Sequence, residues 1–181
     1  VVHYLPAPEE LPEITSSDGH IIQRNESATL SALAFKVTTD KHGTLTYLRV
    51  YSGELEAGER VVNATYGKSE RIGRMFVMQA SRKQPVNAIK AGDIVAVQGL
   101  KHTNTGDSLC SSHCVVQLET ISAAKPVIEV TVEAKNKAEQ KQLGDALRQI
   151  SREDPSLHFS TSNSQEMILA GMGELHLEVV L

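Results

Sequence analysis

The sequence predicts a mainly β domain followed by a smaller α+β domain, and two observations lead to this fold class. Residues 31–118 contain short runs in which apolar and polar residues alternate, separated by turns with glycine and without a helical period. Residues 127–170 instead contain a strand pattern, a helix pattern and two further strand patterns. With 181 residues, 40% of them hydrophobic, the chain is expected to form one or two domains with real cores.

Residues 1–29 are expected to be an extended connector with little core of its own. Prolines and acidic residues alternate closely there, at Pro6, Pro8, Glu9, Glu10, Pro12 and Glu13. The first residues lack the charged and apolar regions of a signal peptide. The chain does not begin with methionine, so we expect it to be a piece of a longer protein.

The first domain is expected to be an antiparallel barrel. A turn in which an acidic residue follows glycine recurs at 57–59, 91–93 and 105–107. Glycine supplies a positive φ, and the acid accepts hydrogen bonds from nearby backbone N–H groups. Closure into a barrel is favoured because about ninety residues then leave few strand edges unpaired. The expected strands cover residues 33–37, 45–51, 60–65, 71–78, 93–99 and 114–119.

The second domain is expected to begin with the order β-α-β-β. Residues 127–132 form the first strand pattern, and Asn136 to Glu139 resembles a capping box that opens a helix. That helix should end at Asp154-Pro155, and a hairpin around 162–164 should follow. This order is the start of a ferredoxin-like fold, in which the next element is a helix. The apolar face of the first helix is predicted to contain Leu143, Ala146, Leu147 and Ile150.

The last stretch, "GMGELHLEVVL" (171–181), fits either a strand or a helix. Its strict alternation of apolar and polar residues suits a strand, whereas the β-α-β-β order calls for a helix. We therefore expect a short helix, followed by the end of the chain before the fold's last strand. Its apolar face would contain Met172, Leu175, His176, Val179 and Val180.

The composition limits the core and the class of function. The chain has no Trp, 3 Phe and 4 Tyr, so its core must consist of Val, Ile, Leu, Ala and Met. The net charge of -4 argues against a generally basic protein but allows a local basic patch. No apolar run approaches the roughly 18 residues that span a membrane. Two cysteines are too few for a disulfide framework, so a reducing, intracellular compartment is expected.

One local basic patch does occur, around residues 66–74 and 82–83. Its five cations are opposed only by Glu70, and such a cluster suits phosphate groups of nucleic acid. Aromatic residues are scarce there apart from Tyr66 and Phe76, so contact with the backbone of folded RNA is expected rather than base readout. The alternative is a strand face whose charges are only solvated. The cations are Lys68, Arg71, Arg74, Arg82 and Lys83.

Other candidate sites are weak. His102, Cys110, His113 and Cys114 could ligate zinc, but they lack a close CxxC pair, so no metal is expected. No nucleophile lies near the acidic and histidine residues of segment 174–178, and the sequence has no G-x-x-x-x-G-K-[ST] phosphate-binding loop. We therefore expect no active site in this chain.

Several long stretches resemble the elongation factor G family, the ribosomal translocases. They include "LRVYSGELEAGE", "SERIGRMF", "AGDIVAVQGLKHTNTGDSLC", "KPVIEVTVEAKNKAEQKQL", "REDPSLHFSTS" and "GMGELHLEVV", and the resemblance covers essentially the whole chain. It implies a translation-factor β-barrel, domain II, at 28–121. An incomplete ferredoxin-like (βαββα) domain III would follow at 125–181. Residues 1–27 would lead from a GTPase domain that this chain lacks.

The resemblance also implies a role on the ribosome. The barrel would contact small-subunit ribosomal RNA, with Lys68, Arg71 and Arg74 as the first candidates and Arg49 as a weaker one. Domain III would couple the parent's GTPase domain to the ribosome, next to a small-subunit protein. This fragment would be non-catalytic, whereas its parent would be a GTPase that uses GTP and Mg²⁺ in the cytoplasm or mitochondrial matrix. No membrane partner is implied. The family motif that starts the second helix of domain III corresponds to Gly171, Gly173, Glu174 and His176.

Three alternatives stay open. The loop at 38–43 and the hairpin at 162–165 look one residue shorter than the family pattern, which would suit a paralogue in ribosome recycling or ribosomal protection. A metal-stabilised binding module would use the His102 to Cys114 cluster. A pure scaffold barrel would carry charges that are only solvated.

Overall fold

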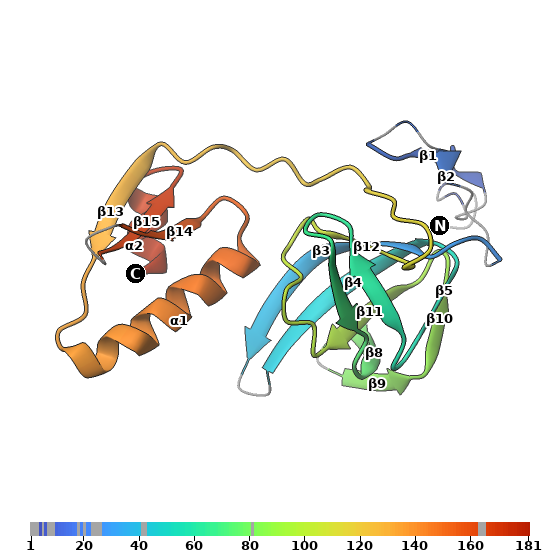
Figure 1. The fold of residues 1–181 in the computed structure, drawn as a ribbon, viewed down its shortest axis with the longest axis horizontal. Coiled ribbons are helices and arrows are strands. Elements are labelled where there is room, and N and C mark those ends of the chain that lie inside the picture. Colours follow the sequence, from blue (N-terminus) through green and yellow to red (C-terminus); the bar gives the residue numbers. More distant parts are fainter. Residues whose placement is uncertain are drawn as a thin grey trace. The chain divides into compact units, whose positions relative to one another are not determined.

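The computed structural model describes residues 4, 6, 10–17, 19, 21–22, 27–40, 43–80, 82–162 and 166–181. These residues divide into two compact units, 1–121 and 122–181, which are described separately (Figure 1). Residues 41–42 and 163–165, where the shortened loop and hairpin were predicted, lie outside the described part. No described helix has the length and apolar character needed to cross a membrane.

The first unit consists of antiparallel strands (Figure 1). Eight of them form one curved sheet in the order β7-β6-β12-β3-β4-β11-β8-β9, while β1 pairs with β2 and β5 with β10. The strands are β1 (Ile14–Thr15), β2 (Ile21–Ile22), β3 (Ser31–Asp40), β4 (Gly43–Ser52), β5 (Glu54–Glu56), β6 (Arg60–Asn63), β7 (Lys68–Arg71), β8 (Met75–Gln79), β9 (Arg82–Val86), β10 (Ala88–Lys90), β11 (Ile94–Gln98) and β12 (Ser108–Cys110).

The curved sheet encloses one hydrophobic cluster, as expected for a barrel. On β4, Leu48 and Val50 point into this cluster, and on β11 Val95 and Val97 do the same. The cluster consists of Leu, Ala, Val, Ile and Met and contains no aromatic residue. The predicted mainly β class and the predicted aliphatic core are therefore confirmed.

The three predicted turns share one structure. Gly58, Gly92 and Gly106 have positive φ values of 89°, 99° and 95°. After each glycine, the acidic side chain accepts a hydrogen bond from a backbone N–H three residues earlier. The bonds are Glu56 N to Glu59 Oε2 (3.1 Å), Lys90 N to Asp93 Oδ2 (3.1 Å) and Asn104 N to Asp107 Oδ2 (2.7 Å).

One predicted strand of the barrel is wrong, and a second is shorter than predicted. The segment 114–119 forms no strand; a short strand lies earlier, at β12, and Leu118 N donates instead to the Ser108 hydroxyl (3.0 Å). The predicted strand 71–78 is interrupted between β7 and β8. The interruption lies at Gly73, where an added Cβ would be 1.8 Å from Gln98 O. The backbone approaches β11 closely at this point, and the pairing changes from β6 with β7 to β11 with β8.

The second unit has the predicted order β-α-β-β-α (Figure 1). Its sheet is antiparallel in the order β13-β15-β14. Leu147, Leu157, Leu169 and Leu177 form the centre of its core. The predicted α+β class is therefore confirmed. The elements are β13 (Ile128–Val132), α1 (Lys137–Glu153), β14 (His158–Thr161), β15 (Met167–Gly171) and α2 (Glu174–Val180).

Helix α1 begins and ends as predicted. Asn136 is the N-cap, and its side-chain oxygen accepts a hydrogen bond from Glu139 N (3.0 Å). The helix stops at Glu153, before Pro155. Of its predicted apolar face, Ala146 is exposed, whereas the three larger residues pack on the core.

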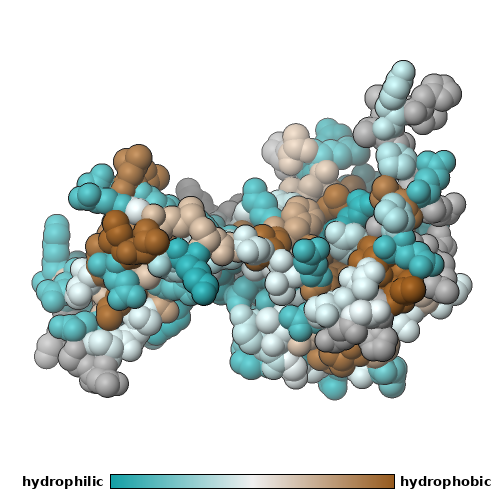
Figure 2. Space-filling view, turned by 90° about the horizontal axis from the view of Figure 1, so that it is seen from above, coloured by the Kyte–Doolittle hydropathy of each residue, from teal (hydrophilic) through white to brown (hydrophobic). Residues whose placement is uncertain are grey.

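The closing segment is a helix, as predicted, but its predicted apolar face is only partly correct. Leu177 is buried and Val180 packs against the core, while Leu175 and Val179 are 73% and 79% exposed. The helix is therefore turned so that part of its apolar stripe faces outward. Hydrophobic atoms reach the surface of this unit in the space-filling view (Figure 2).

Candidate nucleic-acid interface

The predicted basic residues lie on several parts of the barrel. Lys68 and Arg71 are on β7, at one end of the eight-stranded order, and Arg82 and Lys83 are on β9, at the other end. Arg74 lies between β7 and β8. Within this set, all five side chains are exposed. The structure thus distributes these cations over the two strands at the ends of the sheet order and the segment between β7 and β8.

Arg71 is held in place by a neighbouring turn. Its Nε donates a hydrogen bond to Gly58 O (2.9 Å), the glycine of the first turn. The antiparallel pairing of β6 with β7 places Arg60 directly opposite Arg71. Arg60 is exposed and adds a cation to this surface. It was missed from the sequence because it lies eleven positions away, although the hairpin pattern could have indicated the pairing.

Glu70, the acid expected to oppose this charge, points inward. It is 7% exposed, and Oε2 accepts hydrogen bonds from Lys101 N (2.5 Å) and His102 N (3.0 Å). Its Oε1 accepts from the Thr103 hydroxyl at 2.5 Å. Both oxygens are bound inside the barrel, and within the described part of the chain Glu70 forms no ion pair with these cations. The outward side of β7 therefore stays positive.

Arg74 is fixed against the end of β11. Its Nη2 donates to Gln98 Oε1 (2.9 Å), and its carbonyl accepts from Gln98 N (2.9 Å). The close approach of Gly73 to Gln98 brings the two chains together at this point. The guanidinium is therefore positioned on the outside of the barrel rather than free to swing.

Arg49 lies in a different environment, on the outer side of β4. It is half-buried and lines a depression of about 450 Å³ together with Leu11, Phe35, Tyr51 and Ile94. Among the described residues, no carboxylate forms an ion pair with Arg49.

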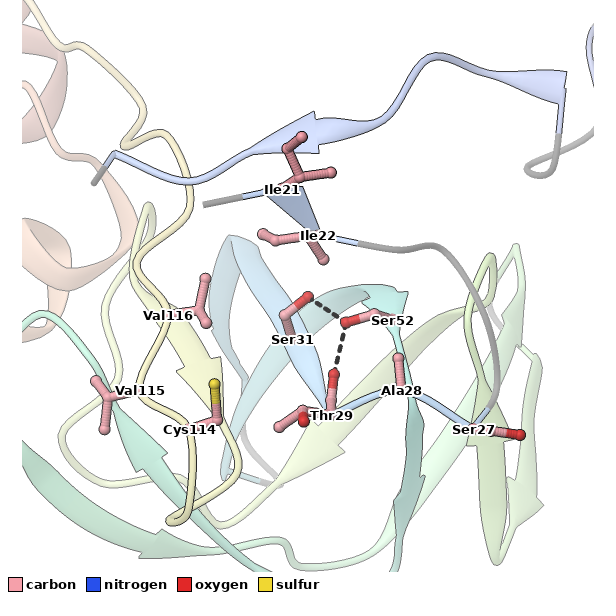
Figure 3. A pocket seen from close by; sticks show the side chains of 10 residues that line it. All are labelled: Ile21, Ile22, Ser27, Ala28, Thr29, Ser31, Ser52, Cys114, Val115 and Val116. Atoms are coloured by element: carbon pink, nitrogen blue, oxygen red, sulfur yellow. Dashed lines mark hydrogen bonds between the residues drawn. The ribbon is translucent and has the colours of Figure 1, made fainter. Parts of the chain in front are cut away.

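A second hollow, of about 500 Å³, lies between β2 and the barrel (Figure 3). Ile22 and Val116 contribute apolar walls, and Ser31 and Ser52 lie at its barrel side. Ser52 donates to Thr29 O (2.6 Å), so its oxygen accepts the proton of Ser31 (2.7 Å). Both hydroxyls are thus used in the structure and neither is activated as a nucleophile.

The candidate zinc ligands do not converge. Cys110 is buried in β12, and its Sγ donates to Val62 O (3.4 Å). Burial raises the pKa of the Cys110 thiol, which disfavours the thiolate that a metal needs. Cys114 is exposed. Within the described part of the chain, no three His, Cys, Asp or Glu residues are placed to hold a metal ion.

Residues of the helix-start motif in the second unit contact one another and the end of α1. Met172 N donates to His176 Nδ1 (3.3 Å), so the neutral ring carries its proton on Nε2, which lies 3.4 Å from Asp154 Oδ2. An added Cβ at Gly171 would lie 2.7 Å from Leu177 Cδ2. The motif residues thus join the start of α2 to the end of α1.

Asp154, the partner of His176, is stabilised in its charged form. Burial acts to raise its pKa, but hydrogen bonds from the Ser156 hydroxyl and N–H, together with His176, outweigh burial and hold the pKa below its ordinary value. The Ser156 hydroxyl donates to Asp154 Oδ1 (2.5 Å) rather than to the histidine. The chain Ser156–Asp154–His176 is therefore not the order of a hydrolase triad.

A β-barrel followed in the chain by an α+β unit is the domain order of a class of translation factors, and both units match one family of that class. Residues 29–112 match the family described as "Elongation factor G domain 2", and residues 123–181 match "Elongation Factor G, domain III". The chain belongs to the elongation factor G family.

A curated relative gives the same assignment. Over 182 aligned residues, which include 100% of this chain, it is 50% identical to "Elongation factor G 2" of Hahella chejuensis (strain KCTC 2396). The chain spans 27% of the length of that relative.

Proposed function

We propose that this chain forms the ribosome-contacting middle part of an elongation factor G-like translocase. Residues 28–121 would contact small-subunit ribosomal RNA. Residues 125–181 would couple the GTPase domain of the same parent to the ribosome, beside a small-subunit protein. Residues 1–27 would connect the barrel to that GTPase domain. The work would take place in the cytoplasm, during GTP-dependent elongation.

One observation supports the RNA contact above the others. Lys68, Arg71 and Arg74 expose their charges, while the only acid of that segment, Glu70, is bound inside the barrel. Phosphate groups provide most of the affinity for nucleic acid, and exposed lysine and arginine side chains bind them. Arg60, Arg82 and Lys83 would extend the same positive surface.

GTP and Mg²⁺ would be held elsewhere in the parent. This sequence has no phosphate-binding loop, and its described residues offer no three-carboxylate or histidine cluster for a metal ion. The residues present therefore do not fit a GTP site, and the chain would contribute affinity and coupling rather than chemistry.

The test is the double variant Arg71→Glu with Arg74→Glu in the full-length parent. Ribosome binding should weaken, and the slope of log affinity against log salt should become shallower by roughly one for each phosphate group that the variant no longer neutralises. The control is Lys36→Glu with Lys90→Glu, which changes the net charge equally at exposed positions of the same barrel outside the basic patch. Equal binding by the two double variants and the wild type would refute the RNA contact.

A further inference from the structure

The outer side of β4 and β11 combines aromatic and basic residues. Tyr47, Arg49 and Tyr51 point away from the core, since they alternate with the core residues Leu48 and Val50. Four of the chain's aromatic residues (3 Phe and 4 Tyr in all) belong to this side. We call it the β4–β11 face, and it consists of Phe35, Tyr47, Arg49, Tyr51, Phe76 and Ile94.

Pairing across three strands brings the rings together. Ala96 of β11 lies opposite Tyr47 on β4 and opposite Phe76 on β8. Ala96 is 0% exposed although it lies outside the core cluster. Its register partners on both neighbouring strands are large aromatic residues. The Phe35 and Tyr47 rings also pack at 6.2 Å between centroids. The face thus contains one pair of packed rings, Phe35 and Tyr47, with Phe76 on the far side of Ala96.

Arg49 lines a depression on this surface that is large enough to hold a small ligand. The depression of about 450 Å³ lies within the size range of small-ligand pockets, roughly 300–1,000 Å³. Phe35, Tyr51 and Ile94 surround the arginine there, and Ile94 is 48% exposed. A half-buried guanidinium with no carboxylate partner among the described residues suits an anion attached to a flat, apolar group.

A second cation, Arg74, lies beside the other end of β11. Arg74 contacts Gln98, four residues along β11 from Ile94, which pairs with Arg49. Four residues of a strand span about 13 Å. Because Arg49 and Arg74 also lie on opposite sides of β11, their separation exceeds this span, which suits two phosphates that are several nucleotides apart on one strand.

We propose that the β4–β11 face binds a single-stranded RNA segment with one unstacked nucleotide in the depression. The base would stack on Tyr51 or Phe35, Arg49 would bind its phosphate, and Arg74 would bind a phosphate further along. This inference rests on the proposed function and adds to it, because the sequence predicted contact with the backbone only. Duplex RNA has no unstacked base, so stacking on the aromatic rings would not increase its affinity.

The test compares two fluorescein-labelled RNAs of about ten nucleotides, a single strand and the matched duplex, by fluorescence anisotropy with the full 181-residue chain. Tyr51→Leu and Phe35→Leu should each weaken binding of the single strand about tenfold and leave the duplex unchanged. Tyr4→Leu is the matched control, since Tyr4 is 90% exposed and lies outside both this face and the basic patch. An abasic single strand should lose the same affinity.

A crosslinking measurement covers variants that fold poorly. A single strand containing 4-thiouridine, irradiated with the unaltered chain, should form crosslinks to peptides containing Tyr51 or Phe35. Crosslinks confined to β7 and β9 would overturn the inference, and so would wild-type affinity of both ring variants. The proposed function would then stand on the Arg71→Glu, Arg74→Glu result.

A second probe tests whether the β4–β11 face binds a protein segment instead of RNA. Leu11, from the acidic segment Glu10 to Glu13, borders the same depression, so a peptide of these four residues is the second probe. If the face binds this peptide but not the single-stranded RNA, its ligand is a protein segment and the inference is wrong. A chain that binds neither RNA at low salt refutes it as well, while ribosome binding by the parent still tests the proposed function separately.

Discussion

Thr103 donates its hydroxyl proton to Glu70 Oε1 at 2.5 Å, inside the barrel and directly behind the exposed cations of β7. This bond and the two from Lys101 N and His102 N connect β7 to the loop after β11. Glu70 therefore stabilises the barrel, and its removal should lower the free energy of unfolding.

Glu70→Ala should lower the free energy of unfolding by about 3 kcal/mol, because it leaves two backbone N–H groups and one hydroxyl without an acceptor in a buried place. Urea denaturation followed by far-UV circular dichroism measures this. Thr103→Val removes only one of the three bonds and should cost about 1 kcal/mol. Similar losses for the two variants would mean that water replaces the missing carboxylate.

Gly73→Ala should destabilise the barrel by about 3 kcal/mol, since its new methyl group would lie 1.8 Å from Gln98 O and force β8 away from β11. Gly67→Ala is the control: φ is +66° there, but nothing lies within 4 Å of the added atom, so only about 1 kcal/mol of backbone strain is expected. Thermal unfolding of both variants distinguishes a steric clash from strain. A smaller effect at Gly73 than at Gly67 would contradict the steric explanation.

Asp107→Asn should change how stability depends on pH. Burial raises the pKa of Asp107 above 3.8, against the opposing hydrogen bonds from Asn104 and Asn63. A raised pKa in the folded state means that this group stabilises the fold fully below pH 3.8 and loses that contribution as pH rises through the folded pKa.

An asparagine oxygen at position 107 can still accept both hydrogen bonds and cannot ionise. The variant should therefore gain stability relative to the wild type between about pH 4 and pH 7, measured by urea denaturation at each pH. Asp93→Asn, at the matching and exposed position of another turn, is the control. A relative stability that falls over this interval would show that the charged form is preferred.

Asp154→Asn should lower the stability of the second unit at neutral pH by about 1 kcal/mol, a value kept small because the side chain is 42% exposed. The pKa of Asp154 is depressed, so its contribution is present above 3.8 and is lost as pH falls through the folded pKa. The difference between variant and wild type should therefore shrink towards about pH 3.

The control for this prediction is Asp145→Asn. Asp145 pairs with Arg148 at 2.9 Å, but both side chains are 62% exposed, so the loss should stay below about 0.5 kcal/mol. Hydrogen exchange of α2 amides measures the local effect, because His176 joins Asp154 to that helix. Equal protection of the α2 amides in both variants would show that the contact between His176 and Asp154 does not stabilise α2.

Local signals in the sequence were enough for much of the fold. The turn residues, the Asn136 cap and the order β-α-β-β-α depend on neighbours in the chain, and each could be predicted. The failures depend on distant contacts. Gly73 interrupts a strand because of Gln98, and α2 turns its Leu177 inward because Gly171 leaves room for it.

The candidate interface was predictable in part for the same reason. Exposed cations near residue 70 follow from composition, whereas the inward direction of Glu70 depends on the loop at 101–103. The segment Leu45 to Tyr51 has large side chains on both faces of its strand, so alternation alone could not show that its two tyrosines lie outside. That arrangement appears only when β11 is placed beside β4.

The aliphatic core has a consequence for spectroscopy. The chain has no tryptophan, and its tyrosines lie outside the core cluster: Tyr47 and Tyr51 are on the outer face of the barrel, and Tyr4 and Tyr66 are exposed. Ultraviolet emission of this protein therefore originates near its surface. It is a poor signal for melting of the interior, but a sensitive one for any molecule that covers Tyr47 and Tyr51, whose quenching can be followed without a label.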